Sequence, residues 1–261
     1  MPQARRVGVV SVLLLAIGVG PMTPQVSGQA VAQADRQYVR LSEIRVKPEA
    51  MADWVEIQKT EAIPMEKKAG SPWRQVWSSG NEFFDRLIIE PIATLADLDG
   101  GNLAVRTIGA EESAALHARI QRTANGVRSV IAEVRLDLGY GPPPQRPRLA
   151  VLTIIDVAHG QARDFEGFLK TEAVPALKKD GTAWVSVMQV LFGDDANRYF
   201  VWTPTANYAE LSKGSPLERG FGVDGARVLA DKTRAMIARF ERRVVRYNND
   251  LSYINTPAAS R

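Results

Sequence analysis

The sequence predicts an α+β protein in which two copies of one unit pack their antiparallel sheets face to face. Three observations lead to this expectation. A segment in the first part of the chain recurs in the second, each copy alternates strand and helix patterns in one order, and a proline-rich stretch separates the copies. The composition, with 45% hydrophobic and 24% charged residues among 261, is that of a globular protein.

The first 34 residues have the pattern of a secretory signal peptide. Arg5 and Arg6 precede an apolar run, and small-x-small sites at Ala30–Ala32 and Ala32–Ala34 follow a turn-prone stretch. The apolar run, Val7–Val19, is shorter than the roughly 20 residues that span a bilayer as a helix, so an uncleaved anchor is the less favoured alternative. We therefore expect an exported protein, periplasmic or secreted, without stable membrane insertion after signal removal.

The clearest internal match pairs Lys59–Pro64 with Lys170–Pro175, because both segments read Lys-Thr-Glu-Ala-x-Pro. Further matches run in order to the ends of both copies: Trp54 with Phe165, Trp73 with Trp184, Leu116 with Leu229 and Tyr140 with Tyr253. Between the copies, prolines exclude helix and central strand. The predicted boundaries are a signal peptide 1–34, repeat one 36–140, a linker 141–147, repeat two 148–253 and a tail 254–261.

Each repeat begins with a strand of β-branched alternation and continues with an amphipathic helix. Gly70 and Gly181 stand where a glycine ends a helix. A hairpin follows, with Gly80-Asn81 and Gly193-Asp194 in its turns. The predicted elements are strands 38–46 and 149–157, helices 49–69 and 161–179, and hairpin strands 73–77 with 83–90 and 184–191 with 198–203.

A second, longer helix is expected over 111–134 and over 224–247. Its apolar residues recur at spacings of three, four and seven, as in the set Leu116, Ile120, Val127, Ile131 and Val134. Short terminal segments, 136–140 and 250–253, complete each repeat as an edge strand.

This order is that of the ferredoxin-like βαββαβ unit, whose helices cover one face of its sheet. The other face must also be buried, and a second copy in the same chain provides the cover. We expect the two sheets to pack face to face within one chain, with the helices outside. A monomer is then possible, with a homodimer through outer helices or edge strands as the alternative.

The arrangement resembles the dimeric α+β barrel superfamily in a tandem form, and the resemblance implies that the two sheets form an intramolecular α+β barrel. Trp73, Trp184 and the Asp-Leu-[Gly/Ser]-Tyr ends at 137–140 and 250–253 look most like the NIPSNAP-type branch. That branch has no catalytic signature to carry over to this chain. The resemblance implies a superfamily that includes haem enzymes, cofactor-free monooxygenases and isomerases, among which the fold does not select.

Strand parity predicts where a ligand would lie. Ile44, Val46, Ile155 and Val157 are uniformly apolar and should face the helices, so the opposite parity should line the space between the sheets. An aromatic wall with a few polar groups suits a small molecule, although an ordinary packed core looks the same. The predicted ligand-binding residues are Glu43, Arg45, Trp73, Trp77, Arg86, Asp156, Trp184 and Arg198.

The Lys-Thr-Glu-Ala-x-Pro segments are the most specific local feature. A proline inside a helix removes one donor, and the carbonyls left without a partner belong to Thr60 and Thr171. A structural kink is the favoured interpretation. The alternative places Thr60, Glu61, Thr171 and Glu172 at a pocket rim.

Other features mainly exclude functions. The chain has no cysteine, so disulfides and thiol catalysis are excluded, and its net charge of +4 gives no case for nucleic acid. His117 and His159 lack metal-ligand spacing, and a surface or cap role is favoured for both. No metal or cofactor is predicted, with haem on His117 as the less favoured alternative.

The predicted function is the binding of a small, partly apolar molecule between the two sheets. Two alternatives stay open. One is an enzyme of the same fold, either a haem-dependent oxidoreductase or a cofactor-free monooxygenase or isomerase that uses Glu43, Arg45 or Asp156. The other is a structural or interaction module without a ligand.

Overall fold

The computed structural model describes residues 36–79, 85–141 and 148–255. The predicted signal peptide, the Gly80-Asn81 turn, the linker after Gly141 and the tail beyond Asn255 lie outside these ranges. No helix within them is long and apolar enough to cross a membrane. Below, the first half denotes residues 36–141 and the second half residues 148–255.

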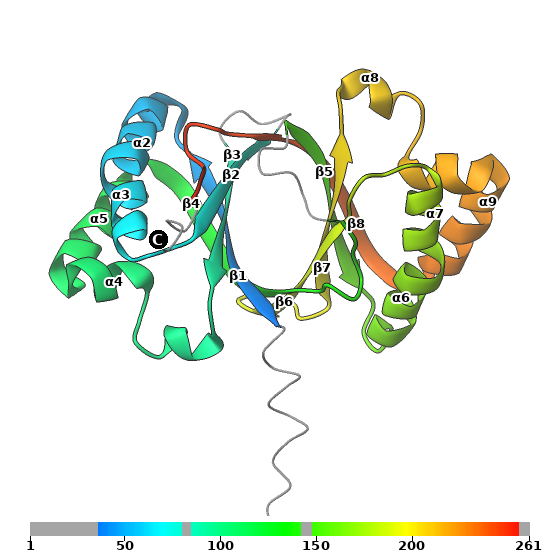
Figure 1. Cartoon of the computed structure of the whole chain (residues 1–261), viewed down its shortest axis with the longest axis horizontal. Helices are drawn as coiled ribbons and strands as arrows, with labels where there is room; N and C mark the ends of the chain where they lie inside the picture. Colours follow the sequence, from blue (N-terminus) through cyan, green and yellow to red (C-terminus); the bar gives the residue numbers. More distant parts are fainter. Residues whose placement is uncertain (1–35, 80–84, 142–147, 256–261) are drawn as a thin grey trace, which may run out of the picture. The chain divides into compact units, whose positions relative to one another are not determined.

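Eight antiparallel strands close into a barrel, seen nearly end-on in Figure 1. In order around the barrel they are β3 (Asp85–Ile92), β1 (Gln37–Val46), β4 (Ala124–Val134), β6 (Ser186–Phe192), β7 (Arg198–Thr205), β5 (Leu149–Val157), β8 (Ile237–Tyr247) and β2 (Trp73–Ser79), which pairs with β3 again. The fourth strand of each half pairs with the second strand of the other, as β4 with β6 and β8 with β2. The barrel therefore closes within one chain, as predicted.

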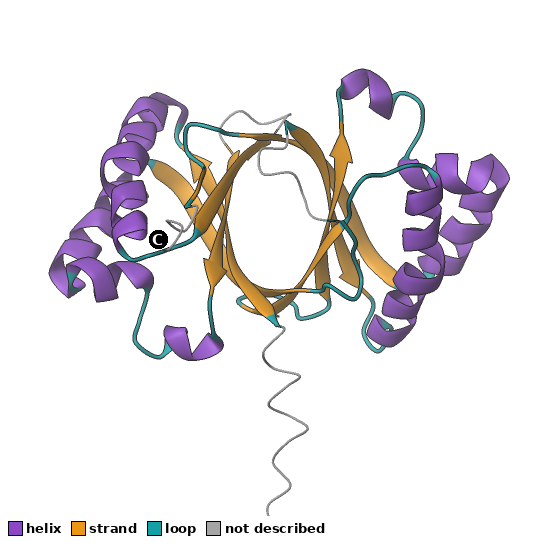
Figure 2. Ribbon diagram, viewed as in Figure 1, coloured by secondary structure: helices purple, strands orange, loops and turns teal. Residues whose placement is uncertain are grey.

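Helices cover the outside of the barrel on two opposite sides (Figure 2). The first half contributes α2 (Met51–Ile57), α3 (Ile63–Lys68), α4 (Leu103–Ile108) and α5 (Ala110–Arg122), and the second half α6 (Ala162–Phe168), α7 (Val174–Lys179), α8 (Tyr208–Leu211) and α9 (Pro216–Arg234). Short 3₁₀ turns lie at Pro48–Ala50 and Leu95–Leu98. Gly70 and Gly181 follow α3 and α7 with φ of 78° and 84°, which confirms the predicted glycine caps.

The Lys-Thr-Glu-Ala-x-Pro segments form π-helical turns, Gln58–Ala62 in the first half and Leu169–Ala173 in the second. Such a turn widens the helix by one residue and accommodates the donor that the following proline lacks. The Thr60 hydroxyl donates to the carbonyl of Glu56, and Thr171 makes the same bond in the second half. The predicted break in the helix is therefore a π-helical turn that both halves share.

The prediction of long helices over 111–134 and 224–247 is wrong in its later part. The helices end at Arg122 and Arg234, and strands β4 and β8 follow. Val127 and Ile131 stand four residues apart, and that spacing keeps one face in a strand as well as in a helix. The hydrogen-bonding partners of β4 lie on β1 and β6, which are distant in the sequence.

The terminal segments are not the fourth strands of their own halves, which corrects a second prediction. Tyr140 forms a bridge with Val185 of the second half. At the end of the second half, β9 (Tyr253–Ile254) pairs with β2 of the first half and places Tyr253 opposite Arg74. Each terminal segment thus adds to a strand of the other half.

The two predicted strand faces are confirmed. Ile44 and Val46 pack under the helices with Trp54, as Ile155 and Val157 do in the second half. The opposite face fills the barrel with buried apolar side chains from all eight strands, and Trp77 contacts Trp202 and Tyr247 there at ring-centroid distances of 5.1 and 5.2 Å. Most of the interior is therefore solid core.

Replacing Trp77, which is 2% exposed, by Ala should lower the free energy of unfolding by about 3–5 kcal/mol, because the interior cannot refill the space. Denaturant titration measures this loss. Phe192→Ala is the control, since Phe192 is 55% exposed and its loss should change stability by no more than about 0.5 kcal/mol. Equal effects of the two changes would contradict a packed interior.

Candidate functional site

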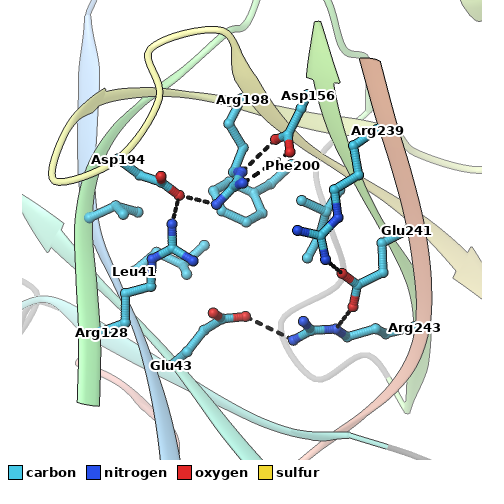
Figure 3. A pocket seen from close by; sticks show the side chains of 12 residues that line it. Leu41, Glu43, Arg128, Asp156, Asp194, Arg198, Phe200, Arg239, Glu241 and Arg243 are labelled. Atoms are coloured by element: carbon cyan, nitrogen blue, oxygen red, sulfur yellow. Dashed lines mark hydrogen bonds and ion pairs between the residues drawn. The ribbon is translucent and has the colours of Figure 1, made fainter. Parts of the chain in front are cut away.

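One end of the barrel interior carries charged side chains, which we call the charged ring (Figure 3). Its members are Glu43, Arg128, Asp156, Asp194, Arg198, Arg239, Glu241 and Arg243. They surround a cavity of about 70 Å³. Such a volume admits a few water molecules and no organic ligand of ordinary size.

Arg198 is the central cation of the charged ring. Its Nε and Nη2 donate to the two carboxylate oxygens of Asp156 at 2.6 and 3.0 Å, and its Nη1 contacts Asp194, which Arg128 also contacts. The hydrogen bonds from Arg198 hold the pKa of Asp156 below its usual range. This half of the ring is a closed set of ion pairs.

The other half of the ring is also paired. Arg243 donates to Glu43 at 2.8 Å and to Glu241 at 2.5 Å, and Arg239 donates to Glu241 at 3.2 Å. The acids and arginines of the ring therefore neutralise one another and leave no charge for a ligand to match. We interpret the charged ring as structural.

The remaining residues predicted between the sheets do not form a site there. Arg45 lies at the rim of the barrel, 3.3 Å from Asp85. Trp77 and Trp184 belong to the packed interior, and Trp73 packs against it. Within the described residues, the interior thus has little room for the ligand that the sequence predicted.

Arg86 lies on the helix side of the sheet, opposite Ile44 on β1 and 6.0 Å from the ring centroid of Trp54. The strand registers explain why. The first-half residue that corresponds to Arg198 is Asp85, one position earlier, and a shift of one residue changes the face of a strand.

A much larger cavity, which we call the outer cleft, lies between the sheet of the first half and helices α3, α4 and α5. Its volume is about 920 Å³, within the range of small-molecule sites. Apolar side chains form much of its lining: Ile44, Met65, Ile88, Ile92, Leu98, Leu103, Leu116, Ile120 and Val127. Both its size and its lining suit a partly apolar molecule.

The floor of the outer cleft carries a polar cluster of Gln58, Glu66, Arg74 and Glu90, called the floor cluster below. Arg74 is 1% exposed; its Nη1 contacts Glu66 and lies 3.7 Å from Glu90, and its Nη2 donates to Gln58 at 2.5 Å. The hydroxyl of Tyr253 donates to Glu66 at 3.3 Å. Arg74 Nε has no hydrogen-bond partner among the described residues.

The pKa of Glu66 is raised by its surroundings. Burial is the main cause and Glu90 contributes to the rise, so that the pKa reaches about 8 in spite of the opposing charge of Arg74. The Glu66 carboxyl therefore holds a proton near neutral pH. A group with this property beside a cleft is able to donate or accept a proton during a reaction.

The second half shows what the same fold looks like without these polar groups. Gln58 and Glu66 correspond to Leu169 and Leu177, which occupy the same places in the π-helical turn and in the next helix. Arg74 corresponds to Val185, since each faces the terminal tyrosine of the other half. Leu169, Leu177 and Val185 are buried in one apolar cluster between sheet and helices. The fold therefore does not require the floor cluster.

The pairs Glu61–Arg119 and Glu172–Lys232 join the first long helical segment of each half to the second. Glu61 and Arg119 also line a side cavity of about 370 Å³. Because both halves form the pair, we interpret the recurring glutamate as structural.

The residues around the outer cleft do not fit a haem. His117 lines the cleft from α5, but its side chain is exposed and no described residue hydrogen-bonds to it. A metal-bound histidine normally donates its second ring N–H to a fixed acceptor. His159 lies in the turn before α6. Over the described ranges, no three His, Asp or Glu residues gather as a metal site.

Comparison with known proteins gives similarity in structure only. No family model and no curated protein sequence matches the chain. A provisionally assigned monooxygenase of Lactobacillus acidophilus is 12% identical, with a TM-score of 0.54 over 84% of this chain and 96% of that one. An anthrone oxidase-like protein is 13% identical, with a TM-score of 0.53 over 86% and 96%.

Chlorite dismutase from Candidatus Nitrospira defluvii is 12% identical, with a TM-score of 0.51 over 82% of this chain and 92% of that one. At such identities, similarity establishes the fold and not the chemistry. The closed antiparallel barrel with helices outside is the fold of the dimeric α+β barrel proteins, and this chain has it.

Proposed function

We propose that this protein binds one small, partly apolar molecule in the outer cleft and that the floor cluster holds the polar end of that molecule. The observation that carries the proposal is the buried Gln58–Glu66–Arg74 cluster at positions where the second half has Leu169, Leu177 and Val185. Names of structurally similar proteins, monooxygenase and anthrone oxidase-like, agree with an organic ligand.

The energetics support a role in binding. Burying a guanidinium and a carboxyl group is costly unless all their hydrogen bonds are made, and one nitrogen of Arg74 finds no partner in the part of the chain that the structure describes. Apolar replacement of such groups is often neutral or stabilising. Because the same chain already has the apolar version in its other half, stability alone does not account for the polar one.

A second candidate function is acid–base catalysis on the bound molecule without a cofactor, as in a cofactor-free monooxygenase or an isomerase. The proton held by Glu66 at the floor of the cleft favours it. In this candidate Glu66 takes the role that the sequence suggested for Glu43, Arg45 or Asp156. Arg74 and Gln58 would orient the Glu66 carboxyl.

We also propose that the two halves are diverged copies of one unit, closest in appearance to the NIPSNAP-type branch, and that residues 1–34 direct export. The recurrent element order and the signal-like composition support these proposals. N-terminal sequencing of protein from an envelope fraction should find a start after Ala32 or Ala34. An intact Met1 would contradict export with cleavage.

The binding proposal is tested by replacing three residues of the floor cluster with the residue types at the corresponding positions of the second half. The triple variant Gln58→Leu, Glu66→Leu, Arg74→Val should fold with equal or greater stability and should bind the neutral fluorescent probe N-phenyl-1-naphthylamine at least about tenfold more weakly, because its amine loses its polar partners. Fluorescence titrations compare the affinities of wild type and the triple variant for the probe. Wild type is expected to bind one equivalent.

Glu43→Gln in the charged ring is the matched control and should leave probe binding unchanged. A folded triple variant with unchanged affinity would contradict the proposal. A Soret band in wild-type protein that His117→Ala removes would instead favour a haem protein.

The protonation of Glu66 makes stability depend on pH. The pKa of Glu66 is about 8 in the folded protein against a usual value of 4.5, so folding is favoured by the proton. The contribution is complete below the unfolded pKa and declines as pH rises towards 8, by at most about 1.4 kcal/mol per pH unit.

Denaturant titrations between pH 5 and pH 9 should show this decline in wild type and a flatter profile in Glu66→Gln. Glu49→Gln, an exposed position, is the control and should keep the wild-type profile. Parallel profiles of wild type and Glu66→Gln would show that Glu66 has an ordinary pKa.

A further inference from the structure

Charged side chains form a row across the outer face of the sheet in the first half. Arg74 faces Tyr253, Glu90 lies 3.7 Å from Arg74, and Arg40 on β1 faces Glu90 in the register of β1 with β3. Arg40, Arg74 and Glu90 all line the outer cleft. The corresponding row of the second half is Tyr140, Val185, Thr203 and Val151.

The row contains more positive than negative charge. Arg74 engages both available carboxyl groups, those of Glu66 and Glu90. Arg40 is half-buried and makes no ion pair or side-chain hydrogen bond with any described residue, although Glu90 is its neighbour on the next strand. Since Glu66 holds a proton near neutral pH because burial raises its pKa to about 8, two guanidinium groups then face one carboxylate.

The other charged residues that line the cleft do not neutralise the positive charge of Arg40. Asp97 lies 3.6 Å from Arg106, so these two lining residues match each other. Lys68, also in the lining, is exposed and adds a further positive charge. An anion that enters the cleft would therefore be attracted towards Arg40.

We propose that the ligand of the outer cleft is an organic anion, an apolar body with one carboxylate or comparable acidic group, and that Arg40, which faces Glu90 of the floor cluster, pairs with that group beside the cluster. The inference rests on the proposed function and narrows its ligand class. The planar guanidinium of Arg40 can donate two parallel hydrogen bonds to a carboxylate or sulfonate. The apolar body would then lie against side chains such as Ile44, Leu116 and Ile120, which share the lining with Arg40.

The test uses two probes with one aromatic frame, 1-anilinonaphthalene-8-sulfonate and the neutral N-phenyl-1-naphthylamine. Wild type should bind one equivalent of each, and the sulfonate more tightly. Arg40→Val, which introduces the residue found at Val151, should weaken sulfonate binding about 10- to 100-fold and leave the neutral probe within about twofold. Arg40→Lys should restore part of the loss, because it keeps the charge without the planar pair of donors.

Arg163→Gln is the control, because Arg163 is exposed on α6 in the second half and does not line the cleft; it should leave sulfonate binding within about twofold of wild type. Thermal melts show whether each variant is folded. If Arg40→Val does not fold, Arg40→Lys still tests the inference. Equal binding of both probes, or sulfonate binding unchanged in both Arg40 variants, would overturn the organic-anion inference while the cleft remained the binding site. Failure of wild type to bind either probe would contradict the proposed function itself.

Discussion

The structure depends on the two seams where the halves exchange strand edges. β4 of the first half pairs with β6 of the second, and β8 pairs with β2. Neither sheet could keep its inner face out of water alone, so closing the barrel gives one shared apolar core around Trp77 and Trp202. The terminal segments reinforce the seams, because Tyr140 and Tyr253 each pair with a strand of the other half.

With the shared interior holding the halves together, the layer between sheet and helices in each half is free to differ. The second half fills that layer with an apolar cluster that includes Leu169, Leu177 and Val185. The first half fills part of it with a smaller apolar cluster around Trp54, leaves the outer cleft beside that cluster, and places Arg74 and Glu66 at the floor. The proposed ligand site therefore uses one helix–sheet layer, while the barrel core and the corresponding layer of the second half are packed with apolar side chains.

Features that depend on neighbouring residues, or that recur in both copies, are predictable from the sequence. Alternation in β1 and β5 identified the faces of Ile44 and Ile155, and Gly70 marked the end of a helix. Strands β4 and β8 are not predicted in this way, since their backbone partners are distant in sequence. The floor cluster is not predictable from residues that the two copies share, because it occurs in one copy only; its signal in the sequence is the difference between Glu66 and Leu177.

The central claim is that the outer cleft holds a small molecule through its floor cluster, and native mass spectrometry tests it most directly. Wild type and the triple variant of Gln58, Glu66 and Arg74 would be purified side by side from the envelope fraction of the native host. The account predicts a mass above the polypeptide, with one ejectable small molecule, for wild type and the bare polypeptide mass for the variant. The same adduct on both proteins, or on neither, would contradict it.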